Sequence, residues 1–323
     1  MRLSMGFRKD IWRVGVLSHP VELIWQAGEI PAGSVTWLPN PEPLAFYADP
    51  FGIWRGDRLY VFVEHYAYAT RRGEIEVFTL DENLSILDSG PALAEPWHLS
   101  YPYVFEHEGE TYLLPEAFQS GRLTLYRADS FPYRWSAVAR LDLDAVPIDA
   151  TPFHHDGRWW LFYAPDRPEA AKTRALHVAF ADSLVGPWRA HPGNLVRYDV
   201  ASSRPGGAVS MSGGVPILPV QDCTMTYGGG LRPLAISKLT TSDFTAKAGP
   251  PLRRPADWRS FDGMHTLSGA GAVTLVDVKR QIMTPDSLRL DFSRHVGGLA
   301  AKLTTPSKHE GPDLRRRLRR NRG

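Results

Sequence analysis

The feature that most constrains the fold is a hairpin-like segment that recurs about every fifty residues. Its first copy is "YADPFGIWRGDRLYVFVE", and the next two are "SYPYVFEHEGETYLLPE" and "ATPFHHDGRWWLFYAPD". In each copy a proline is followed fourteen residues later by a carboxylate, at Glu64, Glu116 and Asp166. A fixed period of this size predicts a repeat architecture, in which each repeat is one supersecondary unit.

Each copy consists of two short apolar runs around a glycine-containing turn, which is typical of a β-hairpin. Looser fourth and fifth copies follow in "SRPGGAVSMSGGVPILPVQD", which ends on Asp222, and in "FDGMHTLSGAGAVTLVDVKR", which contains His265. Further strand-like runs, such as "GEIEVFTL" and "GRLTLYRA", lie between the copies. Each unit therefore has enough strands for a four-stranded sheet, and five units in a closed ring predict an all-β fold, a five-bladed β-propeller.

The expected propeller is a single domain that covers residues 1–304. The chain has 323 residues, 43% of them hydrophobic and 11% aromatic, which is enough to bury a large core. We expect a last strand at "LRLDFS" and an N-terminal strand that closes the ring. The expected blades are roughly 44–96, 97–146, 147–202, 203–257 and 258–295.

The charge distribution and the cysteine content indicate the compartment and the partners to expect. The net charge is +2, but six arginines fall within the last nine residues, so we expect a basic, disordered tail at 305–323. Contact of this tail with an anionic membrane surface is the alternative, and no specific nucleic acid partner is expected. The single Cys223 fits a reducing compartment. Because no run has the length and apolar character of a membrane helix or a signal peptide, we expect a cytoplasmic protein.

The hairpin geometry brings the acids of the repeats together. Two antiparallel strands joined by a tight turn have neighbouring outer ends, so Asp49 is expected beside Glu64. The same geometry pairs Tyr101 with Glu116 and Thr151 with Asp166. Because the first strand of each blade lines the central channel, we expect these ends to meet at one funnel mouth. The residues expected there are Asp49, Glu64, His98, Tyr101, Glu116, Asp149, Asp166, Arg204, Asp222 and His265.

Clustered carboxylates raise one another's pKa and can divide into a proton donor and a base, as glycosidic bond cleavage requires. An architectural role is the alternative, because an Asp before a proline can cap a turn and a repeated acid at a strand end can bind the backbone of the next blade. We favour function for Asp49 and Asp149, and both roles stay open for Glu64 and Asp166. Aromatic residues able to offer flat faces to sugar rings are Trp97, Tyr101, Tyr103, Phe153 and Tyr227.

No cofactor is expected from the sequence. His98 and His265 are candidate ligand-binding or hydrogen-bonded rim residues, and neither has a spacing that names a metal, although a metal at the channel stays an open alternative. The run Gly228–Gly230 follows a strand but lacks the lysine and the spacing of a phosphate-binding loop.

Ten ordered motifs carry a resemblance to a known family. They are "ADPF", "HLSYPYVF", "YLLPEA", "SFPYRW", "DATPF", "WWLFYA", "GPWRAHPGN", "SRPGGA", "QDCTMTYGGG" and "GMHTLS". In this order they look like the N-terminal domain of plant glucosamine inositolphosphorylceramide transferases and its bacterial relatives, over roughly residues 11–280. That domain is similar in fold to the five-bladed propellers of family-43 glycoside hydrolases.

The resemblance implies roles for individual residues. Family-43 hydrolases have an Asp base or nucleophile on blade one, an Asp that modulates pKa on blade three and a Glu acid on a later blade. Carried over, "ADPF" makes Asp49 the candidate base and "IDATPF" makes Asp149 the modulator. Blade four offers "SSRPGG", with Arg204 and no Glu. Glu116 or Asp222 then donates the proton, or the hydrolase chemistry is lost; we take Glu116 as the third catalytic candidate.

If Arg204 occupies the place of the missing acid, we expect its guanidinium close to Asp49 or Asp149, with Glu116 left to hold a proton. We also expect Glu116 to open onto the same cavity as Asp49. A Glu116 turned into a blade interface and bound by backbone donors favours a binding module instead.

Three hypotheses for function stay open. The first is a carbohydrate-active enzyme, a glycoside hydrolase or transglycosylase. The second is a non-catalytic propeller that binds a glycan in polysaccharide or glycolipid biosynthesis, and the third is a scaffold that the basic tail docks to a membrane or an enzyme. The resemblance implies that sugar transfer belongs to a separate C-terminal domain. The expected partners are a carbohydrate ligand and a glycosyltransferase or formyltransferase of the same pathway.

Overall fold

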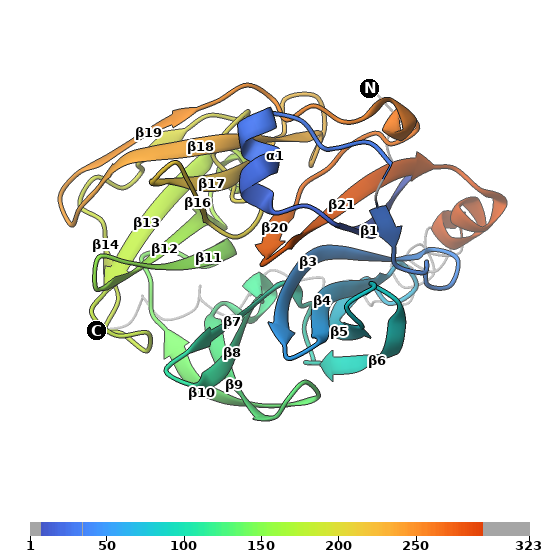
Figure 1. The fold of residues 1–323 in the computed structure, drawn as a ribbon, viewed down its shortest axis with the longest axis horizontal. Coiled ribbons are helices and arrows are strands. Elements are labelled where there is room, and N and C mark those ends of the chain that lie inside the picture. Colours follow the sequence, from blue (N-terminus) through green and yellow to red (C-terminus); the bar gives the residue numbers. More distant parts are fainter. Residues whose placement is uncertain (1–7, 34, 293–323) are drawn as a thin grey trace, which may run out of the picture. The chain divides into compact units, whose positions relative to one another are not determined.

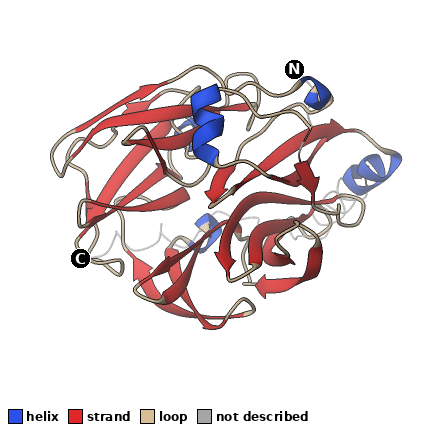
Figure 2. Ribbon diagram, in the orientation of Figure 1, coloured by secondary structure: helices blue, strands red, loops and turns tan. Residues whose placement is uncertain are grey.

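The computed structural model describes residues 8–33 and 35–292 of the chain. Residues Lys9–Ile282 form one compact unit, and the described residues 283–292 belong to a second unit. The first unit consists of five antiparallel sheets, which Figure 1 shows as successive blades. Figure 2 shows how few helices accompany the strands. The predicted all-β, five-bladed β-propeller is confirmed. The expected basic tail lies outside the described residues.

Four of the blades are built from consecutive segments of the chain. Blade one contains β3 (Ala45–Arg55), β4 (Arg58–Ala67), β5 (Arg72–Leu80) and β6 (Ile86–Leu93). Blade two contains β7 (Ser100–His107), β8 (Glu110–Glu116), β9 (Leu123–Ser130) and β10 (Arg134–Leu141). Blade three contains β11 (Pro147–His155), β12 (Arg158–Pro165), β13 (Ala175–Ala181), β14 (Arg189–Ala190) and β15 (Arg197–Tyr198). Blade four contains β16 (Ser210–Ser212), β17 (Val215–Asp222), β18 (Gly230–Leu239) and β19 (Phe244–Ala248).

Blade five joins the two ends of the propeller. The strands β20 (Leu267–Ala270) and β21 (Val273–Ile282) pair with β1 (Lys9–Leu17) and β2 (Val35–Trp37) from the N-terminal side. β1 runs antiparallel to β21 along its full length. Because this pairing covers the edge of β21, the ring closes without leaving that strand open. The predicted closure of the ring therefore uses two N-terminal strands rather than one.

The short helices lie in connections between strands. α1 (Val21–Ala27) follows β1, and the 3-10 helices η1 (Phe118–Ser120), η2 (Glu169–Thr173) and η3 (Ala256–Trp258) lie in later loops. Among the described residues, no helix combines the length and the apolar character that a membrane span requires.

The hydrophobic core of the propeller lies between neighbouring blades. Phe51 and Phe62 of blade one pack in one cluster with Leu113 of blade two, and Leu114 of blade two packs in another with Leu161 of blade three. The side chains of a strand alternate between its two faces, so each sheet can contribute to both of its interfaces. This arrangement leaves the inner ends of the first strands free to carry polar side chains.

The expected last strand "LRLDFS" is wrong, because residues 288–292 belong to a helical segment at 285–292. The Oγ of Ser287 accepts the backbone N–H of Thr284 at 2.9 Å, and the Oγ1 of Thr284 accepts the backbone N–H of Ser287 at 3.2 Å. This reciprocal pair caps the first turn, and Pro285 stands at the favoured first helical position. The capping residues before this segment therefore favour a helix over the expected strand.

Candidate functional site

Buried charged residues from all five blades form what we call the central cluster. Its five carboxylates are at most 6% exposed, and Arg204 and His265 are at most 9% exposed. Burial of five carboxylates with so few cations is unfavourable unless hydrogen bonds or a ligand compensate them. The members are Asp49, Glu64, Glu116, Asp149, Arg204, His265 and Asp277.

A recurring β-bulge positions the inner residues of the first three blades. The register of the first two strands shifts between Ala48 and Phe51 in blade one, and blades two and three have the same irregularity. The residues within these bulges are Asp49 (φ 50°), Tyr101 (φ 47°) and Asp149 (φ 50°). Positive φ is rare outside glycine and is tolerated best by Asp and Asn. The bulges therefore turn three equivalent side chains toward one region, at the expense of local backbone strain.

Asp149 is held by a guanidinium and an amide. The Nε of Arg204 donates to one carboxylate oxygen of Asp149 at 2.6 Å, and the Nη2 donates to the other at 3.2 Å. The Nε2 of Gln221 donates to Asp149 as well, at 2.8 Å. The structure thus places Arg204 against Asp149, one of the two carboxylates named from the sequence. Such a two-point contact is the strong form of an ion pair.

Asp49 belongs to a network with His265 and Asp277. The Oδ1 of Asp49 accepts the hydroxyl of Thr266 at 2.7 Å and lies 3.6 Å from the Nε2 of His265. The Nδ1 of His265 lies 2.6 Å from the carboxylate of Asp277, which also accepts the backbone N–H of Asp49 at 2.9 Å. Burial raises the pKa of Asp49 to about 6, although the neighbouring His265 opposes the rise.

Glu116 lies at the interface between blades two and three. Its carboxylate accepts the backbone N–H of Asp149 at 3.0 Å, in the same way that Asp277 accepts that of Asp49. Burial raises the pKa of Glu116 well above its usual value, and the negative charge of Asp149 raises it further. The architectural alternative, a strand-end acid that binds the next blade, is therefore realised at Glu116.

Glu64 faces a neutral histidine. The Nδ1 of His98 accepts the backbone N–H of Gly73 at 2.8 Å, so the ring proton is on Nε2, which lies 3.6 Å from the Glu64 carboxylate. Burial lowers the pKa of His98 to about 4, and burial together with the charge of Asp49 raises the pKa of Glu64 well above its usual value. Burial therefore favours the uncharged form of both side chains.

Two of the acids expected at the mouth lie elsewhere. Strand pairing joins Ile148 to Ala164, so an alanine takes the place that Glu64 and Glu116 have in their blades. The expected pairing of Thr151 with Asp166 is not formed, because Thr151 lies opposite Phe162. Asp166 lies at the rim, 3.5 Å from the guanidinium of its exposed neighbour Arg167.

Asp222 pairs with Arg232 of the same blade at 2.9 Å, rather than with the central cluster. Partial burial raises the pKa of Asp222, but hydrogen bonds from Thr224 and Arg232 outweigh it, so the pKa lies below its usual value. A carboxylate held in its ionised form is a poor proton donor, which removes Asp222 as an alternative to Glu116.

Tyr101 is fully buried, so it cannot offer a face to a ligand. Its hydroxyl contacts Thr151 at 2.8 Å and accepts the backbone N–H of Gly207 at 2.8 Å. Tyr101 therefore ties blade two to blades three and four. Among the aromatic candidates from the sequence, Tyr227 is 39% exposed and lies beside the cluster. The Nη2 of Arg204 lies 3.4 Å from its hydroxyl, and its ring stands edge-on to His265 at 5.4 Å.

The sequence interpretation missed Asp277, although a signal was present. Asp277 lies fourteen residues after Gly263, the same spacing that separates proline and carboxylate in the earlier copies. Its carboxylate accepts the backbone N–H groups of His265 and Thr266 at 3.0 and 2.9 Å. Asp277 therefore orients both neighbours of Asp49.

One group of described residues has the composition of a metal site. Potential ligand atoms of Asp49, His265 and Asp277 lie within 4.8 Å of one another. However, Asp277 already accepts three backbone N–H groups and contacts the imidazole of His265. The geometry fits a hydrogen-bonded network better than a set of free metal ligands.

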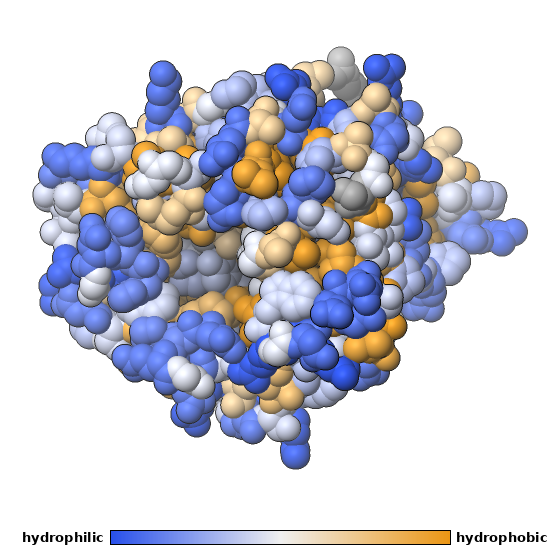
Figure 3. Space-filling model, in the orientation of Figure 1, coloured by the Kyte–Doolittle hydropathy of each residue, from blue (hydrophilic) through white to orange (hydrophobic). Residues whose placement is uncertain are grey.

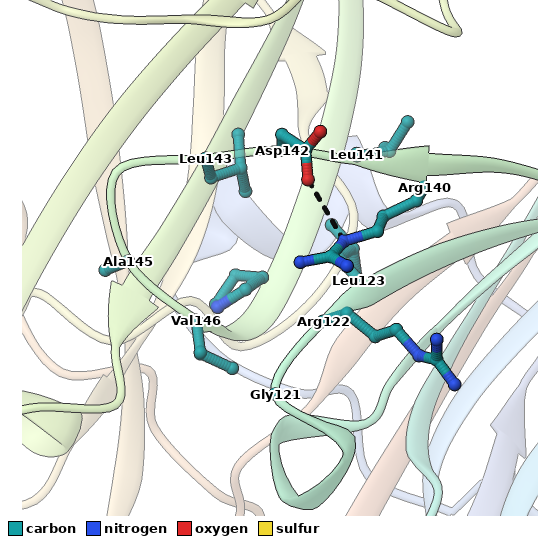
Figure 4. A pocket seen from close by; sticks show the side chains of 10 residues that line it. Gly121, Arg122, Leu123, Arg140, Leu141, Asp142, Leu143, Ala145 and Val146 are labelled. Atoms are coloured by element: carbon teal, nitrogen blue, oxygen red, sulfur yellow. Dashed lines mark ion pairs between the residues drawn. The ribbon is translucent and has the colours of Figure 1, made fainter.

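Described residues outside the cluster line further polar cavities. Figure 3 shows one face of the molecule, with a hydrophilic rim and a hollow near its middle. A cavity of about 220 Å³ is lined by Arg122, Arg140 and Val146 among others, and Figure 4 shows Arg140 paired with Asp142 there. A larger cavity of about 490 Å³ lies between η1 and the segment 166–172.

Comparison with solved structures agrees with the fold. A family 117 glycoside hydrolase of Zobellia galactanivorans is 14% identical with a TM-score of 0.51, over 75% of this chain and 86% of that one. A GH43_1 enzyme from Xanthomonas citri is 15% identical with a TM-score of 0.52, over 82% of this chain and 94% of that one. At these identities the likeness concerns the fold alone.

Relatives found by sequence are more similar to this chain than these solved structures are. Glucosamine inositolphosphorylceramide transferase 1 of Oryza sativa subsp. indica is 34% identical over 273 residues, which is 80% of this chain and 36% of the rice protein. The protein of the same name from Arabidopsis thaliana is 34% identical over 264 residues, which is 75% of this chain and 34% of that protein. The chain thus spans about a third of the length of these relatives. The family model described as "Glucosamine inositolphosphorylceramide transferase 1, N-terminal" matches residues 34–252. The chain therefore belongs to the family of this N-terminal domain.

Proposed function

We propose that the propeller binds a carbohydrate over the central cluster, as a glycan-binding module. The observation that carries the proposal is Tyr227, a 39% exposed residue whose ring lies beside the side chains of Arg204 and His265. A flat apolar face next to a few fixed polar groups is the usual composition of a small-molecule site. The names of the relatives include glucosamine, and the solved neighbours are glycoside hydrolases, which supports a carbohydrate as the ligand class.

Binding fits the cluster better than hydrolysis does. A glycosidase needs two carboxyl groups that flank the scissile bond and are free to exchange protons with the sugar. Here the oxygens of Asp149 accept from Arg204 and Gln221, and Glu116 accepts the N–H of the next blade. Both carboxyl groups are engaged by the protein itself, whereas a binding site needs only the exposed edge of the cluster.

Glycoside hydrolysis is the second candidate, because one observation favours it. The pKa of Asp49 is about 6 and that of Glu116 is raised well above its usual value. At neutral pH Asp49 is therefore mostly ionised, whereas burial and the charge of Asp149 favour the protonated form of Glu116. A base and an acid with separate pKa values are what this reaction uses.

Isothermal titration with a panel of monosaccharides and oligosaccharides tests the proposal, together with two matched tyrosine variants. Tyr227→Ala should abolish binding, whereas Tyr133→Ala should not, because Tyr133 is 38% exposed but hydrogen-bonds Asp88 at the outer strands of blades one and two. Equal affinities of the two variants would refute the proposed site. Incubation with the same glycosides separates the two candidates: release of reducing sugar that Asp49→Asn abolishes supports hydrolysis, and binding without release supports the binding module.

A further inference from the structure

The cavity of about 490 Å³ lies between two loops that follow inner strands. Phe118 and Gln119 of η1 line one side, directly after β8, and Asp166, Glu169 and Lys172 line the other side, after β12. Its volume falls within the range of about 300–1,000 Å³ that ligand sites occupy. We call it the rim cavity.

Two contacts connect the rim cavity to the central cluster. The Nη1 of Arg204 donates to the backbone carbonyl of Lys172 at 3.3 Å, while the same guanidinium holds Asp149. On the other side, the side-chain carbonyl of Gln119 accepts the backbone N–H of His98 at 3.3 Å, and the ring of His98 faces Glu64. Only Ala117 separates Glu116 from Phe118 in the chain. Residues of the cavity wall therefore lie next to residues of the cluster and are hydrogen-bonded to Arg204 and His98.

The charges that line the rim cavity are balanced. The Nζ of Lys172 lies 2.7 Å from the carboxylate of Glu169 and 4.9 Å from the centre of the Phe118 ring. The carboxylate of Asp166 lies 3.5 Å from the guanidinium of Arg167. Each cation thus has an anion beside it, so the lining has no net charge to select an ionic ligand.

This lining selects a neutral ligand that is rich in hydroxyl groups. An aliphatic chain would remove water from two ion pairs and an amide without replacing its hydrogen bonds, which is unfavourable. A phosphate would meet two carboxylates as well as two cations. The hydroxyl groups of a ring can donate to the carboxylates and accept from Lys172 and Gln119, because each hydroxyl has both capacities.

We infer that the rim cavity is a second subsite, which binds a neutral polyhydroxylated ring joined to the sugar at the central cluster. The inference rests on the proposed carbohydrate binding and adds that the ligand has at least two rings. A disaccharide then gains the contacts of the rim cavity, whereas a monosaccharide fills only the site beside Tyr227.

The test compares matched pairs of compounds: glucose with cellobiose, galactose with β-1,3-galactobiose, and N-acetylglucosamine with chitobiose. For at least one pair the wild-type chain should bind the disaccharide about tenfold more tightly, which corresponds to one or two net hydrogen bonds. Gln119→Ala and Lys172→Ala should remove that preference and leave monosaccharide affinity within about twofold. Arg140→Ala, in the separate cavity of Figure 4, is the control and should change neither affinity.

The outcomes distinguish the two proposals. Equal affinities for the members of every pair, with monosaccharide binding that Tyr227→Ala abolishes, would overturn the second subsite and leave the proposed function standing. A disaccharide preference that both rim variants retain would also overturn it. Failure of every compound to bind would overturn both. Because the wild-type comparison needs no variant, misfolding of a variant does not prevent a decision.

Discussion

Replacing Arg204 by methionine tests whether the central cluster is organised by the ion pair with Asp149. The side chains of Arg204 and Asp149 are 11% and 4% exposed, and two hydrogen bonds join them. Methionine keeps much of the apolar stem of arginine and removes the charge. The Asp149 carboxylate then retains the hydrogen bond from Gln221 at 2.8 Å but loses its cation.

The expected effect is large because the remaining charge is buried. Removing one partner of a buried ion pair lowers the free energy of unfolding by about 3–5 kcal/mol. The matched control is Arg232→Met, since Arg232 pairs with Asp222 in the same blade but the two side chains are 25% and 17% exposed. A more hydrated pair is worth about 1 kcal/mol or less.

Urea denaturation followed by tryptophan fluorescence measures both variants at neutral pH. In the double variant Arg204→Met, Asp149→Asn neither residue of the pair carries a charge. Its loss of unfolding free energy should therefore be smaller, by about 2 kcal/mol, than the sum of the losses in the two single variants. Two results would refute the reasoning: an Arg204→Met loss no greater than that of Arg232→Met, or additive losses in the double-mutant cycle.

Two further predictions concern proton binding at Asp49 and the backbone at Gly207. Burial raises the pKa of Asp49 from 3.8 to about 6, so the folded chain binds this proton more tightly than the unfolded chain. Proton binding at Asp49 therefore stabilises the fold fully below pH 3.8, and this stabilisation is lost as the pH rises through about 6. The melting temperature of Asp49→Asn relative to wild type should therefore increase between about pH 4 and pH 7, and a constant difference would contradict this. At Gly207, with φ +141°, a Cβ would lie 1.9 Å from the carbonyl oxygen of Leu267, so Gly207→Ala should destabilise the fold by about 2 kcal/mol or more. The control is Gly213→Ala, whose Cβ would meet no heavy atom within 4 Å. It should lower the free energy of unfolding by about 1 kcal/mol in the same denaturation assay, and equal losses in the two variants would contradict the clash at Gly207.

The fold could be predicted because its signals are local and repeated. The spacing of the hairpins and their glycine turns can be read directly from the chain, and five such units leave few alternatives to a closed ring. Neighbouring outer ends of a hairpin also follow from strand geometry, which is why Asp49 and Glu64 could be placed together. The helix at 285–292 was not predicted, because the short run "LRLDFS" does not distinguish a strand from a helix and the cap at Thr284 lies before it.

The error in blade three arose from the bulge. Counting from the proline placed Asp166 in the series with Glu64 and Glu116, but the structure aligns the blades by the residue in the bulge. Glu64 lies fifteen positions after Asp49, and the same interval from Asp149 leads to Ala164. A bulge inserts a residue without any required sequence pattern, so its position could not be inferred from the proline alone. The burial that sets the pKa of Glu116 likewise depends on the assembled blades.

The assembled ring supplies hydrogen-bond donors to its own buried acids. Asp277 accepts the N–H of Asp49 and Glu116 accepts the N–H of Asp149, so each acid is compensated by the next blade. Blade four departs from this pattern by placing a cation, Arg204, against Asp149. A guanidinium cannot donate a proton to a leaving group at neutral pH, because it stays charged. Arg204 therefore places a fixed positive charge inside the central cluster, against Asp149.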